Sequence, residues 1–196
     1  VPWGIVWEME SFPQTYTWKE TSFQMKTISW SNTTYTATCD REIHLELQSG
    51  ENCYINVEES NNYAYLAVHG GAELQIRFPA DNITWSTLTV ATLFVHEGGK
   101  ITSNGQGPIN TNTRGAGGSH GGEGENGVAS SGDLFAPEIP GGGGGSSGGK
   151  AGGRGGGFID IEVSESFTHY GVIEANGASG EGSAGGGAGG SIHIKT

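Results

Sequence analysis

The sequence predicts an all-β protein in which β-solenoid or β-sandwich rungs are joined to a glycine-rich polyproline II bundle, with essentially no helix. Three observations lead to this fold class. Residues 41–96 alternate apolar and polar side chains, the C-terminal half repeats two short strand motifs, and glycines between those motifs fall at every third residue. Only 34% of the 196 residues are hydrophobic, so the apolar core must be small.

Alternation with a period of two marks residues 41–96 as β-rich. Side chains two positions apart lie on one face of a strand, so these residues predict strands with one buried face. Turn signals such as Gly70-Gly71 separate the strands, and their spacing fits either a sandwich or a solenoid. The apolar positions are Ile43, Leu45 and Leu47; Cys53, Ile55 and Val57; Leu74, Ile76 and Phe78; and Leu93 and Val95.

Two frames repeat in the C-terminal half. Gly99–Gly105 matches Gly171–Gly177, each after a Phe-x-His triplet, and Gly155–Ile161 matches Ala188–Ile194. Strands that recur in this way stack as solenoid rungs.

The distribution of glycine divides the chain. Of 37 glycines, only Gly4, Gly50, Gly70 and Gly71 precede residue 97. We therefore predict an N-terminal arm over residues 1–38, a β-rich domain over 39–96, and a glycine-rich region over 97–196 that continues the solenoid.

The spacing of the glycines favours an ordered bundle over the flexible linker that such composition also allows. Polyproline II has three residues per turn, so a glycine at every third position forms one edge that neighbouring backbones can approach closely. Several segments packed together are needed, because glycine loses more freedom on ordering than any other residue. The predicted packing glycines are Gly115, Gly118, Gly121, Gly124, Gly127, Gly149, Gly152, Gly155, Gly177, Gly180, Gly186 and Gly189.

The N-terminal arm is rich in threonine and aromatic residues. It holds four of the five tryptophans, Trp3, Trp7, Trp18 and Trp30. These side chains either cap the core of the same chain or dock on a neighbouring subunit, since aromatic residues are enriched in interface cores. Strand addition would need such an arm, and we assign it to assembly.

Cysteines and sequons indicate a secreted, extracellular or cell-surface protein. Cys39 and Cys53 would close a loop of about 15 residues, worth roughly 3 kcal/mol in the chain-entropy model of disulfides. Asn32-Thr33-Thr34 and Asn82-Ile83-Thr84 permit N-glycosylation at Asn32 and Asn82. No signal peptide or transmembrane segment is visible and the chain begins without Met, so we expect a mature protein or a fragment.

Charge and residue spacing argue against several functions. A net charge of -12 with nine scattered basic residues gives no footprint for nucleic acid. His96 and His169 hold equivalent repeat positions, and Asp160 and His193 align between repeated strands, so we expect structural ladders and no catalytic residues. No cofactor or metal site is predicted, because the repeated calcium motif is absent; an acidic surface is compatible with calcium but does not support it.

The order of the glycine-rich elements resembles repeats in extracellular and cell-surface structural proteins of protists, algae and plants, including mastigoneme-type flagellar-hair proteins. The elements are Gly117–Gly124, Phe135-Ala136-Pro137 with Pro140, Gly141–Gly145, Gly152–Ile161 and Gly171–Gly177. The resemblance covers roughly residues 90–196 and implies β-helical rungs with polyproline II excursions, surface glycans and assembly into fibres.

The leading hypothesis is a structural subunit of an extracellular glycosylated fibre or tubule. Its partners would be copies of itself and N-linked glycans, with no nucleic acid and no membrane span. The alternative is a carbohydrate-binding module that presents aromatics such as Trp85 or Tyr65. An enzyme acting on polysaccharide would need clustered carboxylates, whereas the four aspartates are dispersed, at Asp40, Asp81, Asp133 and Asp160.

Overall fold

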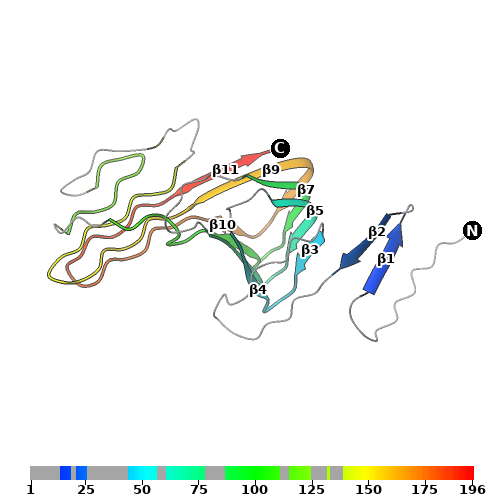
Figure 1. The fold of residues 1–196 in the computed structure, drawn as a ribbon, viewed down its shortest axis with the longest axis horizontal. Coiled ribbons are helices and arrows are strands. Elements are labelled where there is room, and N and C mark those ends of the chain that lie inside the picture. Colours follow the sequence, from blue (N-terminus) through cyan, green and yellow to red (C-terminus); the bar gives the residue numbers. More distant parts are fainter. Residues whose placement is uncertain are drawn as a thin grey trace, which may run out of the picture.

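The computed structural model describes residues 14–18, 21–25, 44–56, 61–77, 87–110, 115–124, 132 and 139–196. These ranges form eleven strands and no helix, which confirms the all-β prediction (Figure 1). An antiparallel hairpin joins β1 (Gln14–Trp18) to β2 (Thr21–Met25). The other strands are β3 (His44–Leu47), β4 (Asn52–Asn56), β5 (Asn61–Val68), β6 (Glu73–Arg77), β7 (Leu88–Val95), β8 (Lys100–Thr102), β9 (Phe158–His169), β10 (Val172–Glu174) and β11 (Ser191–Lys195).

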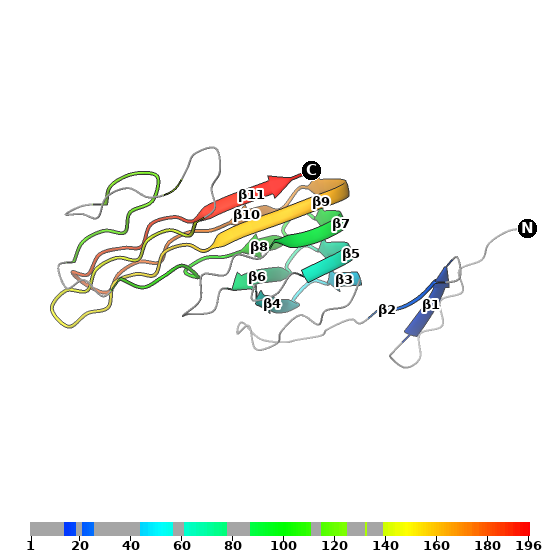
Figure 2. The same ribbon diagram turned by 45° about the horizontal axis from the view of Figure 1, so that its top comes forward.

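These later strands alternate between two parallel sheets. One sheet has five strands in the order β11-β9-β7-β5-β3, and the other has four in the order β10-β8-β6-β4. Each turn of the chain therefore adds one strand to each sheet, and the rungs stack from β3 and β4 to β9, β10 and β11 (Figure 2). Parallel pairing between successive turns identifies a solenoid, because the sheets of a sandwich are antiparallel.

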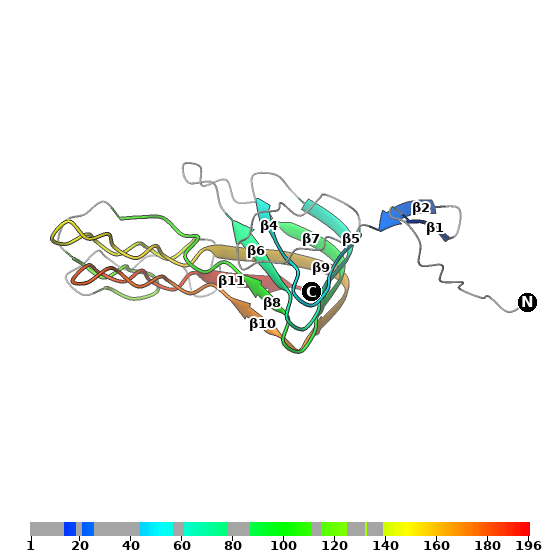
Figure 3. The ribbon, with the colours of Figure 1, turned by 90° about the horizontal axis from the view of Figure 1, so that it is seen from below.

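Tight turns connect the two sheets along one side of the solenoid. The turns after β3, β5 and β7 place Gly50, Gly71 and Gly98 at positive φ angles of 85°, 81° and 76°. In each turn the N–H of the fourth residue donates to the carbonyl of the first at 2.9 to 3.0 Å. This is the type II turn, whose third residue needs the left-handed conformation that glycine adopts without strain. Figure 3 shows the two sheets converging at these turns.

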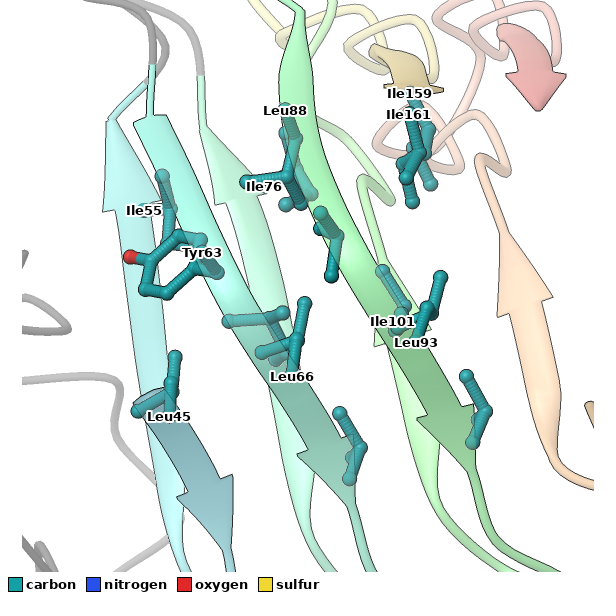
Figure 4. Packing of buried hydrophobic residues seen from close by; sticks show 14 of the residues in the cluster. Leu45, Ile55, Tyr63, Leu66, Ile76, Leu88, Leu93, Ile101, Ile159 and Ile161 are labelled. Carbon is teal, nitrogen blue, oxygen red and sulfur yellow. The ribbon is translucent and has the colours of Figure 1, made fainter. Parts of the chain in front are cut away.

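The hydrophobic core fills the space between the sheets as columns of side chains in register (Figure 4). One column of the five-stranded sheet consists of Leu45, Leu66, Leu93 and Phe167. The facing sheet contributes Cys53, Leu74, Ile101 and Ile173. The first three members of each column are at most 3% exposed, whereas Phe167 and Ile173 at the C-terminal end are only partly buried.

Both repeated sequence frames become neighbouring strands. Val172 of β10 lies opposite Lys100 of β8, and Ser191 of β11 lies opposite Phe158 of β9, as the alignment of the repeats predicts. The predicted boundary after residue 96 falls in the turn between β7 and β8. Strands from both sides of that boundary alternate in the same sheets.

Two long connections leave the solenoid on the side opposite the tight turns. Residues 103–157 join β8 to β9, and residues 175–190 join β10 to β11. Their described parts run side by side, continue the direction of the strands and project away from the sheets (Figures 1 and 2). We call the described residues 105–110, 115–124, 139–157 and 175–190 the glycine bundle.

Candidate functional site

Several predicted site residues lie outside the described parts of the chain. These are both glycosylation candidates, Asn32 and Asn82, together with Cys39 and three of the assembly tryptophans, Trp3, Trp7 and Trp30. Trp18 ends β1 in the N-terminal hairpin. Cys53 is fully buried on β4, and its pairing with Cys39 stays a prediction.

The glycine bundle is held by backbone hydrogen bonds that repeat every three residues. Segment 151–157 shows the pattern. The N–H groups of Gly153 and Gly156 donate to carbonyls of residues 185–190 at 2.9 and 2.8 Å. Their own carbonyls accept from residues 141–145 at 2.8 and 2.9 Å. A three-residue repeat is the period of polyproline II, and here it links three neighbouring segments.

Two of the three edges of segment 151–157 have no room for a side chain. A Cβ on Gly152 or Gly155 would lie 1.8 Å from a carbonyl oxygen on one side. A Cβ on Gly153 or Gly156 would lie 1.9 or 2.0 Å from a carbonyl oxygen on the other. The third edge carries Arg154, whose Nε donates to the carbonyl of Gly107 at 3.2 Å. Glycine is therefore required along both of these edges.

The structure separates the predicted packing glycines into groups. A Cβ would come within 3.0 Å of a neighbouring backbone atom at Gly118, Gly124, Gly152, Gly155, Gly177 and Gly180. Three others, Gly115, Gly121 and Gly149, have positive φ angles of 63°, 54° and 75°, so turn geometry also favours glycine there.

The expected close approach does not occur at four of the predicted glycines. The atom nearest to an added Cβ would be 3.8 Å away at Gly186 and 3.9 Å away at Gly189, and nothing lies within 4 Å at Gly121 or Gly149. These positions lie at the surface or at turns, where the three-residue period no longer meets a neighbour. Gly127 lies outside the described residues.

Sequence reasoning missed the second glycine edge. A Cβ would also meet backbone within 3.0 Å at Gly107, Gly141, Gly142, Gly143, Gly144, Gly153, Gly156, Gly185, Gly187 and Gly190. The signal that could have revealed it was the Gly-Gly doublet repeated every third residue, as at residues 152–153 and 155–156. Such doublets place glycine on two adjacent edges of one polyproline II segment.

Pairs of charged side chains lie across neighbouring strands on the outer face of the last rungs. His193 Nδ1 lies 2.8 Å from Asp160 Oδ1, and Lys195 Nζ lies 2.9 Å from Glu162 Oε1. The first contact is the cross-rung pair that the repeat alignment predicts. Both pairs are substantially exposed, so each contributes little to stability. Within the described residues, no cluster of three or more His, Cys, Asp or Glu side chains could hold a metal ion.

The imidazole ladder at the turns differs from the predicted one. His69, and not His169, stacks on His96, with ring centroids 3.9 Å apart, and His69 Nε2 lies 2.6 Å from Glu46 Oε1. His169 instead lies opposite Val95, because an irregularity in the pairing between Val90 and Thr92 places one extra residue in β9. The equivalence of His96 and His169 was therefore wrong by one residue.

Two histidines near this ladder favour their neutral form. Burial lowers the pKa of His44, which stacks on Tyr65 at 4.5 Å, while the charge of Glu46 opposes the shift. Burial also lowers the pKa of His96, the neighbouring His69 lowers it further, and Glu46 again opposes. Both imidazoles therefore resist protonation in the folded chain.

We expect acid to destabilise the solenoid through these two histidines. The unfolded chain, with an ordinary histidine pKa of 6.5, takes up protons before the folded chain does. The free energy of unfolding therefore decreases as the pH falls below about 6.5, and it recovers when the pH is raised again. Melting temperatures measured between about pH 7.5 and pH 5.5 should fall less steeply for the His44→Gln, His96→Gln double variant than for the wild type. Equal slopes would contradict this assignment.

The last described rung is incomplete on its outer edge. β11 pairs only with Phe158–Glu162 of β9, so no described strand covers residues 163–169 on that side. β10 is likewise the outermost strand of its sheet. We call residues 163–169 together with β10 the open step. Val172 of the open step is 45% exposed, and Tyr170, in the turn between β9 and β10, is 70% exposed.

At the other end of the solenoid, β3 and β4 are the outermost described strands of the two sheets. We call them the first rung. A strand edge without a partner presents free N–H and C=O groups that can pair with another chain. Among the described strands, the open step is such an edge, whereas β2 contacts β3 of the first rung.

Comparison with protein-family models, curated proteins and solved structures found no match for this chain. The architecture alone defines its class, a two-sheet parallel β-solenoid with a lateral glycine bundle. Among the described residues, no helix has the length and apolar character to cross a membrane.

Proposed function

We propose that this protein is a non-enzymatic structural subunit of an extracellular, glycosylated fibre or tubule. The observation that carries the proposal is the open step, an uncovered strand edge at one end of the described solenoid. An edge of this kind can pair with another chain. Where it pairs with a different surface of a second copy, the contact is head to tail, and a head-to-tail contact that does not close into a ring grows into a filament.

The glycine bundle supports the same function. Its segments are joined by backbone hydrogen bonds, and its close-packed glycines leave no room for a side chain, as a cohesive structural element requires. A net charge of -12 would keep the free subunit soluble before assembly. The proposed N-terminal arm, with Trp3, Trp7, Trp18 and Trp30, would add contacts to a neighbouring copy, and glycans on Asn32 and Asn82 would cover the fibre surface.

Assembly of the full chain tests this proposal. Protein purified from a secreting host is concentrated, and its mass distribution is followed by sedimentation while negative-stain electron microscopy records its form. We expect elongated particles whose length grows with protein concentration. A strictly monomeric protein at every concentration would overturn the proposal. Intact mass before and after enzymatic removal of N-glycans tests the predicted glycosylation independently of assembly.

Carbohydrate binding is a second candidate function. It is favoured by aromatic rings beside the stacked imidazoles of His69 and His96. Tyr170 is 70% exposed, and its ring lies 6.1 Å from that of Phe94. Tyr65 is less accessible, because His44 stacks on it, and Trp85 lies outside the described residues. A glycan array probed with monomeric protein would support this candidate through saturable binding that Tyr170→Ala abolishes.

A further inference from the structure

We propose that residues 3–7 of a second copy of this chain add to the open step as a parallel strand, beside residues 165–169 of β9. This inference rests on the proposed function and specifies which surface of the neighbouring copy is used. The contact needs only the open step and the N-terminal arm, so strand pairing at the first rung is not part of it.

The open step offers unpaired backbone groups along half of β9. On one side, residues 163–169 pair with residues 90–95 of β7. On the other side, the pairing of β11 ends with Lys195 opposite Glu162, so no described strand reaches residues 163–169. Such an edge can accept an extended segment of another chain through main-chain hydrogen bonds.

The same end of the solenoid has an apolar surface that lacks a cover. Phe167 and Ile173 are only partly buried, whereas Leu93 and Ile101, their counterparts one rung earlier, are completely buried. Four large hydrophobic side chains are exposed among the described residues, and three of them lie at this end: Tyr170, Val172 and Ile192. A strand that fills the open step should therefore present apolar side chains to the core.

The beginning of the sequence has the pattern that this position requires. Four large apolar residues alternate with a second set that contains two glutamates: Trp3, Ile5, Trp7 and Met9 against Gly4, Val6, Glu8 and Glu10. Side chains two positions apart share one face of a strand, so an extended segment would carry all four large apolar side chains on one face. Tryptophan buries a large area per residue, which suits a strand that covers the end of a core.

The position of β11 limits how the incoming strand can lie. β11 pairs through Lys195 with Glu162 and is followed by Thr196, so the free edge begins near Ser164. Every neighbouring pair in the five-stranded sheet is parallel. A strand that follows this rule begins beside the end of β11 and leaves the row at the tight turn after His169.

Placing Ile5 beside Phe167 satisfies these limits. Residues 3–7 then cover residues 165–169, and their apolar face lies over the exposed end of the core. Pro2 stands just before the strand, where its missing N–H is tolerated.

A neighbouring copy is the source of this strand, because the arm and the open step lie at opposite ends of the solenoid. Residues 1–13 lead into the hairpin of β1 and β2, and β2 contacts β3, the outermost described strand at one end of the five-stranded sheet. The open step lies beside β9, towards the other end of that sheet (Figure 2). An arm that starts at one end of a copy and adds to the other end of the next copy joins them head to tail.

Two adjacent substitutions in the full chain test which face of the arm docks. Ile5→Asn would place an amide against the core of the neighbouring copy, whereas Val6→Asn would change the outer face. We expect the protein concentration needed for half-assembly, measured by sedimentation, to rise at least about tenfold for Ile5→Asn and less than about threefold for Val6→Asn. Circular dichroism should show both variants folded. Equal shifts would overturn the docking of this face.

Cysteine cross-linking tests the edge and the register. Val6 would lie beside Thr168, and neighbouring strands are about 4.8 Å apart, within the Cα range of a disulfide. We expect an equimolar mixture of Val6→Cys and Thr168→Cys proteins to give a covalent dimer on oxidation. Ser164 is exposed on the same strand but lies about 13 Å from Thr168 along it, so Ser164→Cys is the matched control. Equal cross-linking from the two β9 positions would overturn the register.

A single chain that carries both Val6→Cys and Thr168→Cys identifies the source of the strand. We expect oxidation to give a series of covalent multimers, because each copy would donate one strand and accept another. A cross-link confined to monomers would show that the arm folds back on its own solenoid, and would overturn the contact between copies.

Failure of this inference can be told from failure of the proposed function. Fibres that form equally well with Ile5→Asn and Val6→Asn, and without the cross-link to Thr168, would refute the docking of the arm and leave the structural role standing. A cross-linked dimer in a protein that never forms fibres would support the docking and refute the fibre.

Discussion

Replacing Gly155 by alanine is expected to open the glycine bundle, at a loss of about 3 kcal/mol or more in unfolding free energy. The new Cβ would lie 1.8 Å from the carbonyl oxygen of Gly141. Overpacking usually costs about 1–3 kcal/mol, because side chains around it can adjust. Here the obstructing atom is backbone, and moving it breaks the hydrogen bonds that Gly141 and Gly155 make with neighbouring segments. Urea denaturation measures the loss, and trypsin cleavage after Arg154 reports opening of the bundle.

Gly186→Ala is the matched control in the same bundle. The nearest atom to its new Cβ would be 3.8 Å away, an ordinary contact distance, and its φ is not in the left-handed region. Its unfolding free energy should stay within about 0.5 kcal/mol of the wild type, as for most surface substitutions. If both alanine variants were cleaved equally fast, the steric explanation for the glycines would fail.

Truncating Leu93 to alanine should be the most damaging change in the solenoid. Leu93 is completely buried in the column between Leu66 and Phe167. Leucine-to-alanine changes at such sites cost about 2–5 kcal/mol, since a cavity remains. For a chain of this size, a loss of about 3 kcal/mol lowers the melting temperature by roughly 6–12 °C.

Thr92→Ala on the same strand serves as the comparison for Leu93→Ala. Thr92 belongs to the outer face, in the column of His44 and Tyr65, and is only partly buried. Its truncation should lower the melting temperature by no more than a few degrees. Equal effects of the two substitutions on thermal unfolding, followed by circular dichroism, would contradict the inward-facing assignment of Leu93.

The local periodicity of the sequence was enough to predict the strands and their buried faces. Leu45 and Leu74 stand between polar neighbours, and both are buried in the core. Repetition supplied information of longer range, because equal frames stack as neighbouring strands. It thereby predicted the register of Val172 on Lys100 and the contact of His193 with Asp160.

Features that depend on non-local spacing could not be predicted in the same way. The apolar–polar alternation along a strand is the same in a sandwich and in a solenoid. Strand pairing must therefore be known before it is clear that successive strands alternate between two sheets. The slip between His96 and His169 follows from a register shift between Val90 and Thr92, which places one extra residue in β9. No residue motif encodes this shift.

The open step was also hidden from the sequence. It exists because β11 pairs with only the first five residues of a twelve-residue strand, β9. That difference is a property of two strands far apart in the chain. The predicted assembly residues lie elsewhere, in the aromatic arm, and only Trp18 among them falls in a described strand.

The glycine bundle lies to the side of the stacking axis, so the length of the proposed fibre and the reach of its side projections depend on different parts of the chain. Tension along the stacking axis would pass from rung to rung, through the ladder hydrogen bonds and the core columns. The bundle extends to one side of the rungs, from the points where its two connections leave β8 and β10 and enter β9 and β11, so it lies beside this axis. Its segments can then be lengthened in steps of three residues while the rung spacing of about 4.8 Å stays fixed. The reach of the side projections and the strength of the axis would thus vary independently.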